Sequence, residues 1–186
     1  MIGLYAPNAD EVRAVAEQAA LSNPHKLAKQ WLLDKLDTPS GDWDARFLLS
    51  VPGPVWTVAS DTCETGRLEA PKNIAYDDLG REFVYRQPAG PDELAAIMSA
   101  DACEVFACYR FDGLRRWTRT SLSAWHETHN VLLGWVKNLL RKEPSNAAWA
   151  GLDELLSYQT SGEFNMYLTA LHDHLGGQIY VEPRRP

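Results

Sequence analysis

Two histidines and a glutamate stand close together in the segment Trp125-His126-Glu127-Thr128-His129. His126 and His129 are about one helical turn apart, so both could reach one metal ion if another element supplied carboxylates. The spacing is not the His-Glu-x-x-His of zinc proteases, because Asn130 stands four residues after His126. His129 also falls among apolar residues at helical spacing. We therefore interpret it as a core imidazole with hydrogen-bonded nitrogens, and we predict no metal site.

A second cluster, His172, Asp173 and His174, lies near the expected end of a helix. The negative end of a helix dipole favours protonated imidazoles, so helix capping accounts for this cluster. Sequence spacing cannot bring it to His126 or Glu127. If the fold did so, a small metal-dependent or acid/base enzyme would become an alternative function, and we keep it open.

Arg110, Arg115, Arg116 and Arg119 form a basic patch with Trp117 among them. Guanidinium groups beside an aromatic ring are typical of phosphate contacts, so a nucleic-acid accessory protein is a second alternative. The patch is short and the chain is acidic. We therefore favour pairing of these arginines with the chain's own surplus carboxylates.

Three short catalytic signatures are absent from the chain: Gly-x-Ser-x-Gly, Gly-x-Gly-x-x-Gly and Gly-x-x-x-x-Gly-Lys. Active sites can also be assembled from scattered residues, so this absence weakens the case for an enzyme without excluding one. We predict no catalytic residue and no cofactor.

Acidic residues in the loops of the first half of the chain form the remaining group. Carboxylates steer a basic partner and an exposed aromatic ring anchors it, so acids beside Trp43 are typical of a protein-binding surface. Solvated turns around a buried Trp43 are the alternative, because Asp is common in turns. The predicted partner-binding residues are Asp37, Asp42, Trp43, Asp44, Asp61, Glu64, Asp77 and Asp78.

The charge of the 186-residue chain is unevenly distributed. Residues 1–105 carry 17 acidic and 9 basic side chains, a net charge of −8, whereas residues 106–186 carry 8 acidic and 9 basic ones, a net charge of +1. Such a field favours a basic protein partner and disfavours general binding to nucleic acid.

The cysteines, Cys63, Cys103 and Cys108, form no CxxC pair, and we find neither a signal-peptide pattern nor a run of ~18 apolar residues. We expect a cytoplasmic protein without a membrane partner.

Apolar residues at helical spacing predict a helix-rich second half. The longest helix is expected over 121–142, followed by helices over 147–158 and 162–175. In the first half, Asn8 or Asp10 begins a helix that ends near residue 21. Further helices are expected over 25–36 and 91–99.

Strands are expected over 1–6, 45–51, 55–60, 73–76, 81–87, 104–111 and 178–182. Prolines 52 and 54 suggest a hairpin between the second and third of these, and the turn Asp77-Asp78-Leu79-Gly80 joins 73–76 to 81–87. The alternation of Phe83, Val84 and Tyr85 supports an antiparallel sheet.

These elements predict one α+β domain over residues 1–186, with a mostly antiparallel sheet layered against several helices and a helix-rich C-terminal half. The leading functional hypothesis is a non-catalytic acidic binding protein that masks a basic partner surface, as an inhibitor or a toxin-neutralising immunity protein would. The partner would be a basic protein, such as a toxin or an enzyme.

Overall fold

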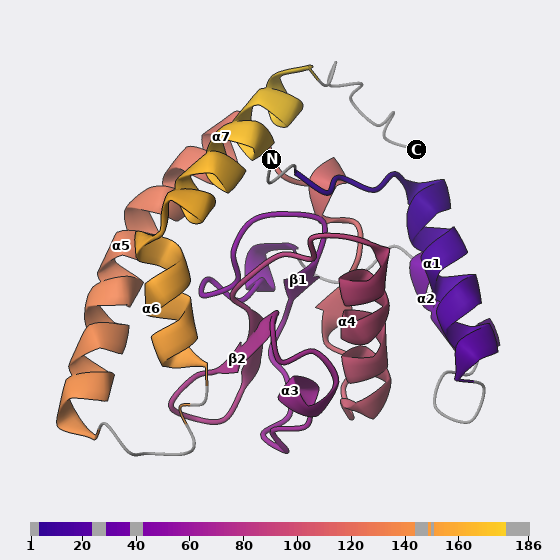
Figure 1. The fold of residues 1–186 in the computed structure, drawn as a ribbon, viewed down its shortest axis with the longest axis horizontal. Helices are drawn as coiled ribbons and strands as arrows, with labels where there is room; N and C mark the ends of the chain where they lie inside the picture. The colour runs from indigo at the N-terminus through magenta and orange to yellow at the C-terminus, as the bar shows by residue number, and fades with distance from the viewer. Residues whose placement is uncertain (1–3, 24–28, 38–42, 144–148, 150, 178–186) are drawn as a thin grey trace.

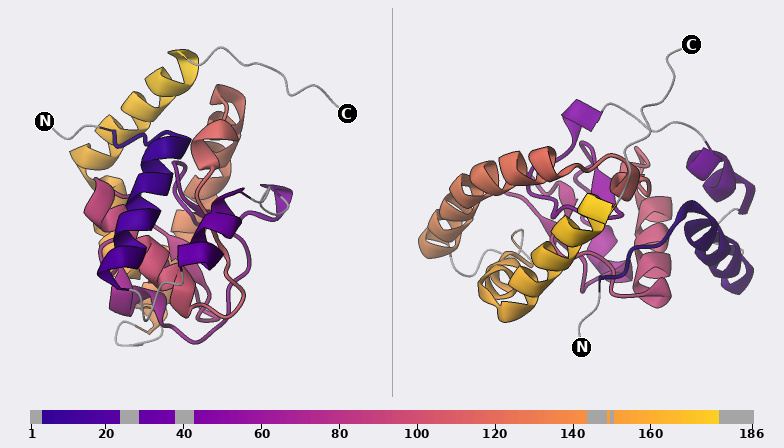
Figure 2. Two further views of the ribbon diagram at one scale, coloured as in Figure 1. Left: turned by 90° about the vertical axis from the view of Figure 1, so that its right-hand side faces the viewer. Right: turned by 90° about the horizontal axis from the view of Figure 1, so that it is seen from above.

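The computed structural model describes residues 4–23, 29–37, 43–143, 149 and 151–177. Short strands and their loops lie in the middle, with helices on two sides (Figures 1 and 2). One side consists of α5 (Arg119–Lys142), α6 (Leu152–Thr160) and α7 (Gly162–Gly177), and the other of α1 (Ala9–Ser22), α2 (Lys29–Asp37) and α4 (Pro91–Cys103). The predicted α+β class and the helix-rich C-terminal half are confirmed.

The strands form two small antiparallel sheets. Strand β2 (Ile74–Tyr76) pairs with β3 (Glu82–Val84), with Ala75 opposite Phe83, so the predicted hairpin around the Asp77–Gly80 turn is confirmed. Strand β1 (Trp56–Thr57) pairs with β4 (Tyr109–Arg110), which is distant in the sequence. Side chains from these sheets reach both groups of helices.

The predicted hairpin of 45–51 with 55–60 is wrong. Residues 45–51 form the end of a short 3-10 helix, η1 (Trp43–Ala45), followed by turns. The segment 52–54 packs instead against Gly113, the first residue of the 3-10 helix η2 (Gly113–Arg115). Gly113 N donates to Pro54 O at 3.0 Å, and a Cβ on Gly113 would lie 2.1 Å from Gly53 O. Residues 52–54 therefore pack against Gly113 rather than form a hairpin turn, and β1 pairs with β4.

Two other strands were overpredicted. Residues 4–6 are not in a strand, and residues 1–3 and 178–182 lie outside the described residues. Of the strand predicted over 104–111, only Tyr109–Arg110 is extended and paired. The preceding residues form a turn in which Ala107 N donates to Glu104 O at 3.2 Å.

Local capping accounts for where α1 and α5 begin. Asn8 caps α1 through a capping box, because its side chain accepts from Glu11 N at 3.0 Å and the Glu11 carboxylate accepts from Asn8 N at 2.8 Å. Thr118 and Ser121 form the corresponding box at the start of α5. Helix α4 runs four residues beyond the predicted end at residue 99, because Asp101 is buried beside Lys35 rather than ending the helix.

The core consists of three clusters of buried side chains. One joins α1, α2 and α4, a second surrounds Trp125 of α5, and a third packs α5 and α6 against the β2–β3 sheet. His129 faces this interior, as predicted, and stacks on Trp125 with ring centroids 4.1 Å apart. Neither of its nitrogens has a hydrogen-bond partner of normal geometry in the described residues, so the predicted hydrogen bonds are wrong. Burial lowers the pKa of His129 to about 4.

Candidate functional site

Three adjoining loops carry exposed apolar side chains. They are residues 61–69, which include α3 (Gly66–Glu69), residues 77–80 between β2 and β3, and residues 104–107 after α4; together we call them the loop surface. Helix α3 packs against α4, beside which it lies in Figure 1. The exposed fractions are 81% for Leu68, 61% for Leu79, 74% for Val105 and 66% for Phe106. Single exposed apolar residues are ordinary, whereas a large exposed apolar patch is typical of interaction surfaces.

Asp61 and Glu104 tie the first of these loops to the third. Glu104 Oε1 accepts from Asp61 N at 2.6 Å, and Asp61 Oδ2 accepts from Val105 N at 2.9 Å. The remaining oxygens accept from Cys63 N at 2.8 Å and Cys108 N at 2.9 Å. Both carboxylates are buried. Because they satisfy backbone N–H groups that would otherwise lack partners, they fix the paths of both loops.

Asp77 holds the second loop from within. Its Oδ1 accepts from Leu79 N at 3.0 Å and from Arg81 N at 2.8 Å, and its Oδ2 accepts from Arg81 Nε at 2.7 Å. The Asp77 side chain is only 1% exposed. The β2–β3 turn next to it contacts the first loop, since a Cβ on Gly80 would lie 3.1 Å from Glu64 Oε1.

Glu82 lies beneath the first loop. Its Oε1 accepts from Gly66 N at 2.6 Å, and its Oε2 accepts from the Tyr109 hydroxyl at 2.5 Å. Burial raises the pKa of Glu82, although these hydrogen bonds oppose the shift. Burial also raises the pKa of Tyr109 well above its ordinary value. The pair therefore anchors α3 from a buried position that disfavours charge.

Two non-glycine residues of the loop surface have positive φ angles, 57° at Glu64 and 48° at Ala107. Such a conformation costs about 1–3 kcal/mol and persists only where surrounding contacts impose it. Around Ala107 these contacts are plain, because its carbonyl accepts from Lys35 Nζ at 2.9 Å and also from Arg110 Nη1. The loops are held in a definite shape without a partner.

The loop surface is acidic. Residues 61–69, 77–80 and 104–107 contain six carboxylates and one arginine, Arg67, and a second arginine, Arg81, follows the second loop. Both arginines are engaged within the protein, Arg67 with Glu154 at 2.9 Å and Arg81 with Asp77 at 2.6 Å. The negative field has a local effect, since the charge of Asp61 raises the pKa of the exposed Cys63 thiol. A basic partner would be attracted to this surface.

The structure divides the predicted partner-binding residues into two groups. Asp61, Glu64, Asp77 and Asp78 all belong to the loop surface. Glu64 and Asp78 are exposed, whereas Asp61 and Asp77 are buried and point inward. A partner would therefore meet the loops that Asp61 and Asp77 hold rather than their carboxylates. The participation of all four in binding stays a prediction.

The other predicted residues lie near Trp43 in the sequence, and Asp42 is outside the described residues. Trp43 is half-buried and makes edge-to-face contacts with Trp56 and Trp117, at centroid distances of 5.0 and 4.9 Å. Asp37 forms an ion pair with Arg13 of α1, and Asp44 is exposed. This region thus combines exposed carboxylates with an aromatic ring that mainly packs inside the protein.

Sequence reasoning missed the exposed apolar residues Leu68, Leu79, Val105 and Phe106. For Leu79 a signal existed, because an apolar residue between Asp78 and Gly80 in a tight turn has little chance of burial. Val105 and Phe106 were placed inside a strand, where one of two neighbours is normally buried. The turn at residues 104–107 exposes both.

The structure brings one residue of the second histidine cluster, His172, close to the first cluster. His126 and Glu127 of α5 line a groove of about 440 Å³ with His172 of α7. His174 lines a different cavity. In the described residues no three His, Cys, Asp or Glu side chains are placed to hold a metal ion. The acid/base enzyme stays a prediction that rests on these three groove residues alone.

The basic patch is largely used inside the protein. Arg116 Nε pairs with Asp112 Oδ2 at 2.6 Å, and Arg119 donates to a backbone carbonyl of α7. The predicted pairing with the chain's own carboxylates is thus confirmed for Arg116. Arg115 is exposed, and its side chain has no hydrogen-bond or ion-pair partner in the part of the chain that the structure describes. A nucleic-acid interface would depend mainly on this one residue.

Neither a known protein family, nor a curated protein, nor a solved structure matches this chain. In the described ranges, no helix is both long and apolar enough to cross a membrane. The function must therefore be argued from the loop surface itself.

Proposed function

We propose that this protein is a non-catalytic acidic binding protein that masks a basic partner surface, as an inhibitor or a toxin-neutralising immunity protein would. It docks through the loop surface. The observation that carries this proposal is the set of four exposed apolar side chains on loops held from beneath by buried carboxylates. The predicted residues Glu64 and Asp78 lie on the same loops.

The apolar side chains supply the affinity. Covering one large apolar side chain contributes about 1.5–3 kcal/mol, so Phe106 and Leu79 together can anchor a partner. The shape of the loops lowers the cost of binding, because loops already fixed by Asp61, Asp77 and Glu104 lose little conformational freedom on association.

The charges select the partner. Exposed Glu64 and Asp78 flank the apolar tips, so the matching surface has an apolar pocket surrounded by lysine and arginine. A cytoplasmic location fits this proposal, because none of the three cysteines forms a disulfide and Cys63 is exposed.

The test uses the full-length protein as bait in an extract of its native host. Wild-type protein is compared with a Leu79→Ser/Phe106→Ser variant and with Val131→Ser, a control on α5 whose side chain is 74% exposed. We expect a basic protein that wild type and the control retain and the double variant loses. With purified partner, the double variant should bind at least about 100-fold more weakly.

Folding is checked in the same samples. Substitutions at exposed positions away from buried contacts change stability by about 0.5 kcal/mol or less, so all three proteins should unfold at the same urea concentration. The proposal fails if the purified partner binds the double variant as tightly as it binds wild type. It also fails if the interaction has no dependence on salt.

A further inference from the structure

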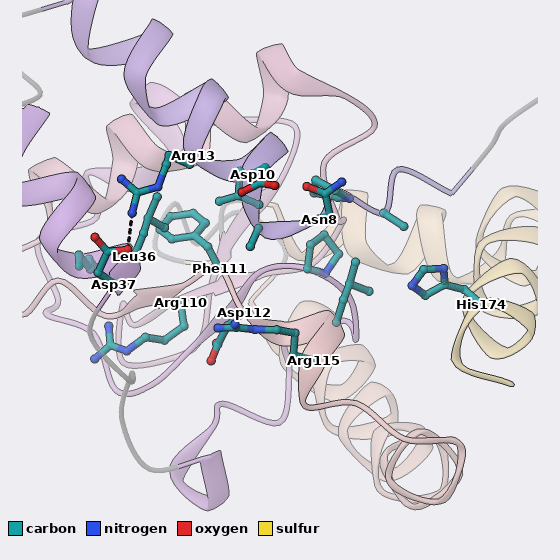
Figure 3. A pocket seen from close by; sticks show the side chains of 17 residues that line it. Asn8, Asp10, Arg13, Leu36, Asp37, Arg110, Phe111, Asp112, Arg115 and His174 are labelled. Carbon is teal, nitrogen blue, oxygen red and sulfur yellow. Dashed lines mark hydrogen bonds and ion pairs between the residues drawn. The ribbon is translucent and has the colours of Figure 1, made fainter. Parts of the chain in front are cut away.

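A cavity of about 540 Å³ lies between α1, α2, the β4–η2 segment and the end of α7. Figure 3 shows Arg110 and Arg115 on one side of it, Asn8 and Asp10 of the α1 start on the opposite side, and His174 at one end. Its volume is that of an ordinary small-molecule site.

Cationic side chains dominate this cavity although the chain as a whole is acidic. Four lysine and arginine side chains line it, against three aspartates. Of the four cations, Arg13 pairs with Asp37 and Lys35 pairs with the buried Asp101, which leaves Arg110 and Arg115 without an ion pair among the described residues. Of the three aspartates, Asp37 and Asp112 form ion pairs with Arg13 and Arg116. The remaining one, Asp10, is exposed at the start of α1.

Arg115 and Arg110 retain unused donors. The exposed Arg115 side chain has no hydrogen-bond or ion-pair partner in the described part of the chain. Arg110 donates through Nη1 to the carbonyls of Ala107 and Tyr109, and within the described residues no hydrogen bond uses its Nη2. A guanidinium group with unused donors is suited to carboxylate and phosphate oxygens, which it can bind in pairs.

Besides Asn8 and His174, apolar side chains form the remaining walls. They include Val12 of α1, Leu36 of α2, and Pro54, Phe111 and Leu114 from the central loops. A ligand filling this space would therefore place a charged group near the arginines and an apolar body against these residues.

We propose that this cavity binds a small organic anion, with its carboxylate or phosphate on Arg115 and Arg110 and its apolar part against Phe111 and Leu114. Asp10 limits the affinity, because its charge repels the anion. The site does not depend on partner binding at the loop surface.

The test is a titration of the full-length protein with phenyl phosphate at low salt. Binding is measured by calorimetry and by changes in amide chemical shifts. We expect saturable binding at one site, with shifts in residues 8–12 and 110–115. Arg115→Gln should weaken binding about tenfold or more, because a charge-assisted pair is lost. Arg115 is preferred to Arg110, which also supports the Ala107 carbonyl.

Two further variants keep the test specific. Arg141→Gln removes the same charge from the exposed end of α5 and should leave the affinity unchanged. Asp10→Asn should tighten binding. The proposal is overturned if no shifts saturate in the two segments, or if Arg141→Gln weakens binding as much as Arg115→Gln. Equal affinity for inorganic phosphate would overturn the role of the apolar walls.

Discussion

The region around Trp43 and the loop surface are both acid-rich, but they use their carboxylates in opposite ways. Near Trp43, Asp44 faces solvent while the aromatic ring packs against Trp56 and Trp117. In the loop surface, Asp61 and Asp77 are buried while the apolar side chains face solvent. The second arrangement leaves more apolar area for a partner.

The difference shows what decides whether an acidic residue is a surface charge. A loop that turns sharply leaves backbone N–H groups without partners, and a nearby carboxylate that satisfies them is drawn inside. Asp77 accepts two such N–H groups and Asp61 another two. Near Trp43, it is the aromatic ring rather than a carboxylate that packs inside the protein. The Cζ atom of Arg46 lies over this ring, 4.8 Å from its centroid.

The largest effect we predict separates two neighbouring acids of the β2–β3 turn. Asp77→Ala leaves the N–H groups of Leu79 and Arg81 without their acceptor, together with the Arg81 guanidinium. We expect a loss of about 3 kcal/mol in the free energy of unfolding. Urea denaturation measures it.

Asp78→Ala is the matched control, because it removes an exposed carboxylate one position along. Its effect should stay within about 0.5 kcal/mol. Equal losses for the two variants would contradict the distinction between buried and exposed acids in the loop surface.

The next effect concerns Trp43. If the ring mainly packs inside the protein, Trp43→Ala should destabilise it by about 2 kcal/mol, less than for a fully buried tryptophan. The measurement is again the free energy of unfolding, with Leu48→Ala, a 41% exposed neighbour, as the control. A change below about 0.5 kcal/mol would instead favour Trp43 as a free anchor for a partner.

Local patterns predicted the helices well and the strands poorly. Asn8 and Pro91 located helix starts correctly, and the apolar spacing after Ser121 located the start of α5 to within two residues, because capping and amphipathic spacing act within one or two turns. The β1–β4 pairing joins residues more than fifty positions apart. It depends on the packing of Gly113 against 52–54, which no local pattern reveals.

The candidate site was predicted in part for the same reason. Glu64 and Asp78 were chosen for their charge and do lie on the loop surface. The exposure of Phe106 could not be predicted, because it follows from a turn stabilised by Glu104 and by the distant Lys35. Whether a neighbouring acid is buried or exposed likewise depends on which backbone N–H groups the fold leaves unpaired.

The third prediction compares the two regions in binding. Glu64→Lys/Asp78→Lys should slow association with the basic partner about tenfold at low salt and flatten the dependence of the rate on ionic strength. Asp44→Lys, in the Trp43 region, should have little effect. Stopped-flow association kinetics measure both. A larger effect from Asp44 than from the pair would move the binding surface to the Trp43 region.

The smallest expected effect concerns Glu82 and appears as a dependence on pH. Burial raises its pKa in the folded protein, so between its unfolded and folded pKa values the folded protein binds more protons. The contribution of Glu82 to the free energy of unfolding of wild type therefore decreases as the pH rises through its folded pKa. Glu82→Gln does not titrate and can still accept from Gly66 N.

The stability of Glu82→Gln relative to wild type should therefore be more favourable at pH 8 than at pH 5, when both proteins are unfolded with urea. Comparing the two proteins at each pH cancels the titration of all other groups. Glu64→Gln, which removes an exposed carboxylate from the same surface, should have little effect at either pH. A relative stability that does not change with pH, or that falls as pH rises, would show that Glu82 is readily ionised beneath α3. The loops would then be held by a charged carboxylate, as at Asp77, and the buried acids of the loop surface would act alike.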